Sequence, residues 1–190
     1  MMNIQEDIRR AVEVMRQGGV ILYPTDTVWG IGCDATNAEA VAKVYKIKHR
    51  EDSKALICLV DSDVRLQRYV RNAPEVAWQI MELANKPTTV IFDNAVNLAP
   101  NLVAEDGSIA MRITQEPFSK ELCYRFQKPI VSTSANISGE PAAENYKDIS
   151  EELLNAVDYV CYSRRQEKQP HTPSSIIKIK TDGQVQIIRK

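Results

Sequence analysis

The chain has 190 residues, of which 44% are hydrophobic and 26% charged, and no tract is of low complexity. This composition is typical of a globular protein and excludes a disordered or fibrous chain. Its formal net charge of −1 excludes a protein that coats nucleic acid through overall basicity, so any site for a polyanion must be a local patch.

The first half of the chain predicts alternating helices and strands. Ile8, Val12 and Met15 share one helical face, and the pair Gly18-Gly19 stops that helix. A helix over 37–47 has Asn37 as its N-cap, and a helix over 74–84 has Pro74 near its first turn. The remaining elements are strands over 20–24 and 54–60 and a helix over 62–71.

The second half continues the alternation and ends on a hairpin. It predicts strands over 88–92, 108–113, 129–133, 159–162, 174–179 and 184–189, and helices over 117–126 and 146–156. The last two strands flank "TDG", a hairpin turn, which favours a mixed sheet over an all-parallel one. Because no composition break interrupts the chain, we expect one α/β domain over 4–190, a twisted mixed sheet flanked by helices.

The cysteines and the N-terminus indicate a cytoplasmic protein. Cys33, Cys58, Cys123 and Cys161 are far apart and lie in or beside apolar stretches, so we expect four separate, reduced, mostly buried thiols. With two histidines in the chain, a His/Cys zinc site has little support, and we expect no protein-bound metal. The charged N-terminus has no signal-peptide core, and no apolar run reaches the length of a membrane span.

One segment combines an apolar strand with a cluster of hydroxyl groups. In "IVSTSANISGE" (130–140) Ser132, Ser134 and Asn136 stand where a buried strand ends. These residue types are common in turns, so an ordinary turn explains them. The alternative is a polar cradle at the edge of the sheet, where open α/β sheets usually bind ligands.

Three further segments place polar residues near the ends of predicted elements. "YPTDTVWGIG" (23–32) sets Thr25 after a strand, although a turn before a helix has a similar sequence. "KIKHRED" (46–52) places Lys48 and Arg50 at the end of a helix, where basic residues also complement the helix dipole. Arg112 lies inside the apolar strand "IAMRI", and a guanidinium there needs solvent, a carboxylate or a phosphate.

The sequence lacks the standard catalytic motifs. It contains neither GxxxxGK[ST] nor GxGxxG, and no GxSxG elbow. What remains is fixed positive charge with neutral donors, which suits a site that holds a polyphosphate and stabilises charge on it.

Four segments together resemble the YrdC-like family, the threonylcarbamoyl-AMP synthases also called TsaC. They are "YPTDTVWGIG", Lys48-x-Arg50, "AMRI" and "STSANISG", in the family's order and spacing. The similarity covers essentially the whole chain. The resemblance implies a twisted mixed sheet with a large, concave, positively charged groove, in the short, single-domain form of the family.

The resemblance also implies an activity and its substrates. Members condense L-threonine, bicarbonate or CO2, and ATP into L-threonylcarbamoyl-adenylate, with release of pyrophosphate. This is the first step of the threonylcarbamoyladenosine (t6A) modification of tRNA, completed by separate transfer proteins. A Mg2+ ion held chiefly by the phosphates is expected, and many members are described as binding double-stranded RNA.

Residue roles follow from the same resemblance. Lys48 and Arg50 are implied as catalytic residues that contact the triphosphate of ATP. Ser134, Asn136 and Thr89 are implied to complete the ATP site. Four residues are implied to bind threonine or bicarbonate, with the guanidinium on the amino acid's carboxylate: Thr25, Arg112, Ser132 and Ser174. Because cationic side chains at a helix end are usually exposed, we expect Lys48→Ala to reduce turnover and leave folding intact.

The chain departs from the family pattern in two loops. "NKPTT" (85–89) has Lys86 in place of a glycine, and "SRRQEKQPHTPSS" (163–175) replaces a glycine-rich stretch. These changes concern the shape of the loop over the nucleotide. The "RRQEK" run is either a solvated charged loop or a patch that faces RNA or phosphate.

Two other functions remain open on the sequence. One is a non-catalytic RNA-binding or ribosome-maturation factor of the YciO-like type, which shares a "YPTD" start but lacks an intact K-x-R and S-x-N. The other is a sugar-phosphate enzyme such as dihydroxybutanone phosphate synthase, whose acidic metal ligands have no counterpart at matching places here.

Overall fold

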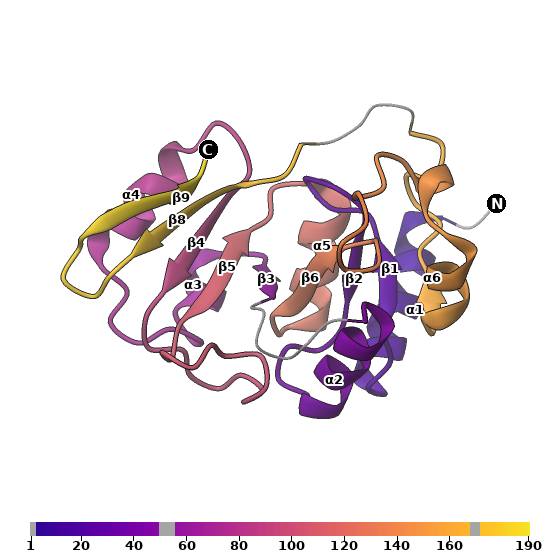
Figure 1. Cartoon of the computed structure of the whole chain (residues 1–190), viewed down its shortest axis with the longest axis horizontal. Coiled ribbons are helices and arrows are strands. Elements are labelled where there is room, and N and C mark those ends of the chain that lie inside the picture. The colour runs from indigo at the N-terminus through magenta and orange to yellow at the C-terminus, as the bar shows by residue number, and fades with distance from the viewer. Residues whose placement is uncertain (1–2, 50–55, 168–171) are drawn as a thin grey trace.

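A computed structural model describes residues 3–49, 56–167 and 172–190 of the chain, shown in Figure 1. The helices are α1 (Ile4–Arg16), α2 (Ala38–Ile47), α3 (Asp63–Leu66), α4 (Glu75–Leu83), α5 (Pro117–Phe126), a 3-10 turn η1 (Tyr146–Asp148) and α6 (Glu151–Ala156). The strands are β1 (Ile21–Tyr23), β2 (Gly30–Gly32), β3 (Ile57–Val60), β4 (Thr88–Phe92), β5 (Ile109–Ile113), β6 (Ile130–Ser134), β7 (Tyr159–Val160), β8 (Ser175–Ile179) and β9 (Val185–Arg189).

The strands form one mixed sheet, which confirms the predicted fold class. Over the described residues their order is β7-β1-β2-β6-β3-β5-β4-β8-β9. The pairs β1/β7, β3/β5 and β4/β8 are parallel, and the other neighbours are antiparallel. The closing β8–β9 hairpin forms one edge, as Figure 1 shows in yellow.

The two faces of the sheet bury alternate residues of the same strands. Ile21, Tyr23 and Leu59 pack with α1 and α5 in one apolar cluster. Leu22, Cys58 and Val60 belong to a second cluster, which includes residues of α2. Successive side chains of a strand point to opposite faces, so a continuous apolar run is the pattern of a sheet covered on both sides.

Several predicted elements have the predicted bounds or nearly so. β4 and α5 match their predicted ranges, and Asn37 caps α2 by accepting hydrogen bonds from the main-chain nitrogens of Glu39 and Ala40. All four cysteines are buried free thiols, which confirms the prediction for them. No helix in the described ranges is long and apolar enough to cross a membrane.

Other predictions were wrong in extent. The helix predicted over 62–71 is the four-residue α3, which ends at Leu66. The helix predicted over 146–156 is divided into η1 and α6, because Ser150 has an extended backbone and caps α6 through the main-chain nitrogen of Leu153. The sequence also failed to predict β2, whose residues belong to the segment 23–32 for which no strand was predicted after Pro24.

Candidate functional site

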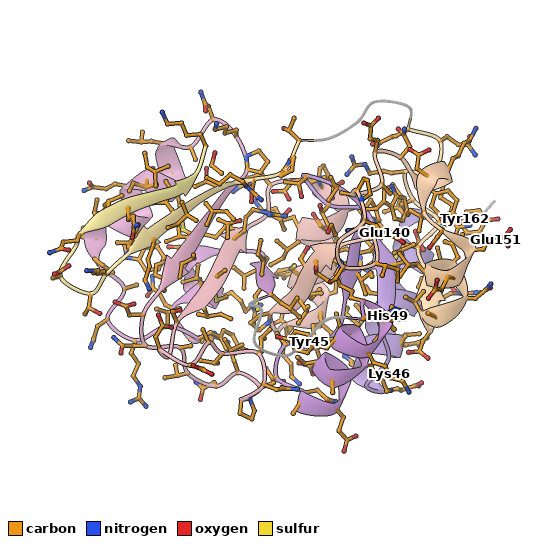
Figure 2. All side chains as sticks on the ribbon, viewed as in Figure 1. Tyr45, Lys46, His49, Glu140, Glu151 and Tyr162 are labelled. Atoms are coloured by element: carbon orange, nitrogen blue, oxygen red, sulfur yellow. The ribbon has the colours of Figure 1, made fainter. Side chains whose placement is uncertain are left out.

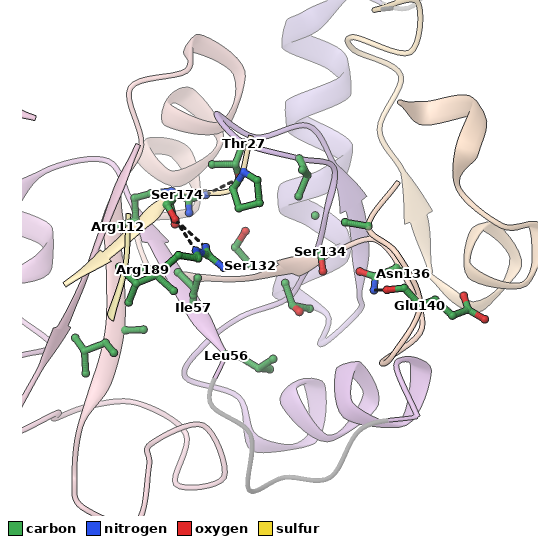
Figure 3. A pocket seen from close by; sticks show the side chains of 18 residues that line it. Thr27, Leu56, Ile57, Arg112, Ser132, Ser134, Asn136, Glu140, Ser174 and Arg189 are labelled. Atoms are coloured by element: carbon green, nitrogen blue, oxygen red, sulfur yellow. Dashed lines mark hydrogen bonds between the residues drawn. The ribbon is translucent and has the colours of Figure 1, made fainter. Parts of the chain in front are cut away.

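A cavity of about 510 Å³ opens at the edge of the central strands. Five of the nine residues predicted for the site line it: Arg112, Ser132, Ser134, Asn136 and Ser174. Figure 3 shows Arg112 and Ser174 on one side of the cavity and Ser134 with Asn136 on the other. The hydroxyl cluster at the end of β6 therefore faces a cavity, which favours a polar cradle over an ordinary turn.

Arg112 is the buried cation of one wall. Its side chain is 4% exposed, and Nη2 lies 2.9 Å from Oδ1 of Asp26 in the turn between β1 and β2. Nη2 and Nη1 also donate hydrogen bonds of 3.3 Å to the hydroxyls of Thr27 and Thr89. Burial raises the pKa of the Asp26 carboxyl above its ordinary value, and the charge of Arg112 partly offsets this.

Thr89 lies behind this wall and connects it to β8. Its hydroxyl is 2.8 Å from the hydroxyl of Ser174, and either can be the donor. Thr89 is fully buried and is not among the described residues that line the cavity, whereas Ser174 is. In this structure Thr89 positions Arg112 and Ser174.

Arg189 is a lining residue that the sequence analysis missed. Its Nε and Nη2 donate hydrogen bonds of 2.9 and 2.8 Å to the main-chain oxygen of Ser174, as Figure 3 shows. A basic residue at the end of a strand gave the only sequence signal, and it had no feature to distinguish it from a solvated charge. The cavity therefore has a second cation, from the last described strand.

Asn136 holds the loop after β6 in shape. Its Nδ2 donates hydrogen bonds to the main-chain oxygens of Ile137 (3.0 Å) and Glu140 (2.7 Å). Its Oδ1 is buried and has no hydrogen-bond partner among the residues that the structure describes. A buried acceptor without a hydrogen-bond partner favours a ligand that donates a hydrogen bond to it.

Lys48 joins the end of α2 to the same loop. Its Nζ donates hydrogen bonds to the main-chain oxygens of Ser134 (2.5 Å) and Asn136 (2.7 Å), and the residue is 2% exposed. The expectation of an exposed lysine was wrong, because the ammonium is buried against main-chain oxygens. Its neighbours Lys46 and His49, labelled in Figure 2, are exposed.

Two predicted residues remain to be accounted for. Arg50 lies outside the residues that the structure describes. Thr25 is buried, and its hydroxyl donates a 2.6 Å hydrogen bond to the main-chain oxygen of Val28 and lies 3.1 Å from the hydroxyl of Thr27. Thr25 thus shapes the turn that carries Asp26 and Thr27.

The arginines of the "RRQEK" run make contacts within the protein. Arg164 donates a 2.6 Å hydrogen bond to the main-chain oxygen of Thr25, and its Nη1 is 3.5 Å from a carboxylate oxygen of Glu116. The guanidinium of Arg165 lies 4.2 Å from the ring centre of Tyr162 and 4.8 Å from that of Tyr146. These two residues therefore fix the segment against the turn and the neighbouring rings.

The cavity is equipped to bind an anionic ligand with an apolar part. It has two guanidinium groups and several hydroxyls, and Leu56, Ile57 and Ile176 add apolar surface. Glu140 is the one carboxylate among its described lining residues. No group of three or more His, Cys, Asp or Glu side chains in the described ranges could hold a metal ion.

A family model and a curated relative each match most of the chain. The Sua5/YciO/YrdC family model, described as "telomere recombination", matches residues 13–190. The threonylcarbamoyl-AMP synthase of Stenotrophomonas maltophilia is 38% identical over 151 residues, which cover 78% of this chain and 81% of that protein.

Two solved structures have a similar fold. E. coli YciO aligns with a TM-score of 0.84 and 24% identity, over 98% of this chain and 89% of that one. P. abyssi Sua5, solved in complex with L-threonine, aligns with a TM-score of 0.82 and 23% identity, over 94% of this chain. The chain spans about half of that Sua5, 52% of its length. At these identities the two structures support the fold alone.

Proposed function

Because the chain belongs to the Sua5/YciO/YrdC family, we propose that it makes L-threonylcarbamoyl-adenylate from L-threonine, bicarbonate or CO2, and ATP, releasing pyrophosphate. It is then an ATP-dependent nucleotidyltransferase that acts in the first step of tRNA t6A modification. The observation that carries the proposal is a cavity, in a chain of this family, that brings together two cations and two polar residues of the β6 loop: Arg112, Arg189, Ser134 and Asn136. The name of the Stenotrophomonas maltophilia relative supports the same reaction.

The cavity has groups suited to each part of ATP. The guanidinium of Arg189 and the hydroxyl of Ser134 are donors for phosphate oxygens. The guanidinium of Arg112 and the hydroxyls of Ser132 and Ser174 are proposed for threonine and bicarbonate instead. The unpaired Oδ1 of Asn136 cannot bind a phosphate oxygen, so it suits a ribose hydroxyl or a base amino group. The apolar lining offers a surface for the adenine ring.

The reaction needs alignment and charge stabilisation more than a protein nucleophile. The amine of threonine forms a bond to the carbon of CO2, and the resulting carbamate oxygen attacks the α-phosphorus as pyrophosphate leaves. Negative charge grows on the pyrophosphate, and fixed cations beside it lower the barrier. Lys48, Arg50, Arg189 and the hydroxyls of the β6 loop are proposed for this task, with Thr89 and Thr25 holding the walls.

Mg2+ is proposed to arrive on the triphosphate. The described part of the chain has no cluster of acidic ligands for it, and this fits an ion whose ligands are phosphate oxygens and water. Bound there, the ion would neutralise part of the phosphate charge. Glu140, the one carboxylate of the described lining, offers oxygens suited to its water shell.

A test of the reaction measures pyrophosphate release from purified protein with ATP, Mg2+, L-threonine and bicarbonate. We expect release when all four are present and none when threonine or bicarbonate is omitted. Mass spectrometry should find the adenylate at the same time. Pyrophosphate release that does not depend on threonine would contradict the proposal.

tRNA and the downstream transfer proteins are proposed as cytoplasmic partners. The product is a mixed anhydride that water destroys, so it must pass quickly to a protein that transfers it to tRNA. The YciO-like alternative is an RNA-binding factor without catalysis, and the fold does not separate the two, because E. coli YciO and P. abyssi Sua5 both share it. A tRNA titration at physiological salt separates them: specific binding without any turnover would favour the alternative.

A further inference from the structure

The ion pair of Asp26 and Arg112 lies between two cavities. Arg112 lines the cavity of about 510 Å³. Asp26 lines a second cavity of about 210 Å³ on the side of Lys86 and Gln115. Asp26 reaches Arg112 from the turn between β1 and β2, although β2, β6 and β3 separate their strands in the sheet. The pair is therefore the product of tertiary folding rather than of neighbouring strands.

The guanidinium of Arg112 has unused binding capacity. Nη1 donates to Thr89 and Nη2 to Thr27, in weak hydrogen bonds of 3.3 Å. Nε is buried and has no hydrogen-bond partner within the described ranges. A guanidinium can bind both oxygens of one carboxylate along its Nε–Nη2 edge. Asp26 places one oxygen beside one nitrogen of that edge. A carboxylate that contacts both nitrogens would therefore bind the guanidinium more completely.

The carboxylate of Asp26 is also incompletely satisfied. Its Oδ1 is 2.9 Å from Nη2 but is buried without a hydrogen bond to any residue that the structure describes. Burial raises the pKa of this carboxyl, so its carboxylate accepts a proton more readily than an exposed aspartate does. The ionisable groups that influence it or line its cavity are Arg112, Glu116, Arg164, Tyr23, Cys123 and Lys86.

We propose that Asp26 accepts a proton from the ammonium group of the amino-acid substrate after the substrate's carboxylate has displaced it from Arg112. This inference rests on the proposed function and adds a proton acceptor to it. The two charged groups of an α-amino acid are attached to one carbon. An amino acid whose carboxylate binds the Nε–Nη2 edge therefore brings its ammonium close to the displaced Asp26.

The proton transfer comes before the N–C bond forms. One N–H bond of the ammonium breaks, the proton moves to an oxygen of Asp26, and the electron pair stays on nitrogen. That pair forms the N–C bond to CO2, and one C=O pair moves onto oxygen. The nitrogen loses its next proton to water, which leaves the carbamate. When the product leaves, Asp26 returns its proton to solvent and pairs again with Arg112. An ammonium that keeps its proton has no electron pair for CO2.

The first test compares Asp26→Asn with Asp26→Glu in the pyrophosphate assay, with threonine varied at saturating ATP. In Asp26→Asn we expect kcat to fall about 100-fold, within the usual range for the loss of a general base. We expect KM for threonine to stay the same or fall, because no anion then competes for Arg112. Asp26→Glu should restore at least about a tenth of kcat, since it restores the acceptor.

A matched control breaks a similar ion pair elsewhere. Asp61 and Arg65 are 3.0 Å apart with side chains 10% and 7% exposed, and neither lines the two cavities. Asp61→Asn should lower thermal stability and leave kcat unchanged. The proposal is overturned if Asp26→Asn keeps kcat within about threefold of wild type, if its KM for threonine rises as kcat falls, or if Asp61→Asn loses as much activity.

The wild-type pH profile provides a test that needs no variant. We expect kcat/KM for threonine to fall on the acid side with an apparent pKa above the usual aspartate value of about 3.9. A profile that stays flat down to about pH 4.5 in protein that circular dichroism finds folded would overturn the role of Asp26. If the wild type releases no threonine-dependent pyrophosphate, the proposed function fails. If wild type and Asp26→Asn are equally active, the role of Asp26 alone fails.

Discussion

Lys48 holds the segment that carries Asn136: its Nζ lies 2.7 Å from the main-chain oxygen of Asn136 and 2.5 Å from that of Ser134. The main-chain nitrogen of Ser138 also donates a 3.0 Å hydrogen bond to the main-chain oxygen of Lys48. The end of α2 and the polar loop after β6 are therefore connected through both side chain and main chain. A nucleotide that binds this loop depends on a buried lysine.

Replacement of Lys48 should reduce both stability and activity. Lys48→Ala leaves two main-chain oxygens without their charged donor, and we expect a loss of about 3 kcal/mol in the free energy of unfolding. Loss of the loop's geometry and of a positive charge should lower kcat/KM for ATP at least about 100-fold. Urea denaturation and the pyrophosphate assay measure the two effects.

Lys46→Ala is the control for this variant. Lys46 lies in the last turn of the same helix and is exposed (Figure 2). Its replacement should change the free energy of unfolding by less than about 0.5 kcal/mol and leave turnover as in wild type. A Lys48→Ala protein with wild-type stability would show that the two hydrogen bonds contribute nothing to the fold.

Gly32 should tolerate no side chain. A Cβ atom at this position would come within 2.6 Å of both Cε1 of Tyr23 and the main-chain oxygen of Val131. We expect Gly32→Ala to cost about 3 kcal/mol, because both neighbours are buried and one of them is backbone. The free energy of unfolding measures this loss, and a change below about 1 kcal/mol would contradict it.

Gly30→Ala adds a side chain on the same strand where the neighbouring atoms are farther away. Its Cβ would lie 3.2 Å from Cγ2 of Thr25 and 3.3 Å from Oγ of Ser132, both of which are side-chain atoms that can shift. The loss of stability should be smaller than in Gly32→Ala. Because Gly30 lines the cavity, we expect activity to fall more than stability does.

The four cysteines should be unreactive in the folded protein. All four are buried, and burial raises the pKa of the Cys58 thiol to about 12 and of the others above their ordinary value. The thiolate is the reactive form, so a maleimide at about pH 8 should modify none of them. In denaturant all four should react. Modification of any one in native protein at the rate of a free thiol would contradict this.

The sequence predicted the elements whose signals are local. Asn37 and the apolar spacing after it define α2, and the run "TTVIF" defines β4. β2 has the sequence "GIG", and two glycines in three residues give no strand signal. This strand is defined by its pairing with β1 and β6, and the close approach of Tyr23 and Val131 explains the glycine at position 32. Both are properties of the tertiary structure.

The sequence could predict which residues belong to the site, but not which of them contact one another. Arg112 was a candidate because a guanidinium inside an apolar strand needs a partner. Its partner Asp26 follows β1, which lies four places from β5 in the strand order of the sheet, and no local pattern contains this relation. The burial of Lys48 was unpredictable for the same reason, since its acceptors are more than 80 residues away in the chain. Whether it also touches phosphate stays a prediction.

Arg189 should contribute to binding of ATP. It is one of two cations on the described lining, and both hydrogen bonds to Ser174 point its guanidinium toward the cavity wall (Figure 3). Removal of one charged contact to a phosphate costs about 1.4 kcal/mol or more, which is a tenfold change in affinity. Arg189→Ala should therefore raise KM for ATP about tenfold and affect KM for threonine less.

Two further variants make this prediction specific. Arg189→Lys keeps the charge and loses the fork that holds the oxygen of Ser174, so its KM for ATP should lie between those of wild type and Arg189→Ala. Lys180→Ala removes a positive charge from the same hairpin at an exposed position that is not among the described lining residues. It should leave both KM values unchanged. If Lys180→Ala raises KM for ATP as much as Arg189→Ala does, the effect comes from the overall charge of the hairpin, and Arg189 has no direct contact with the nucleotide.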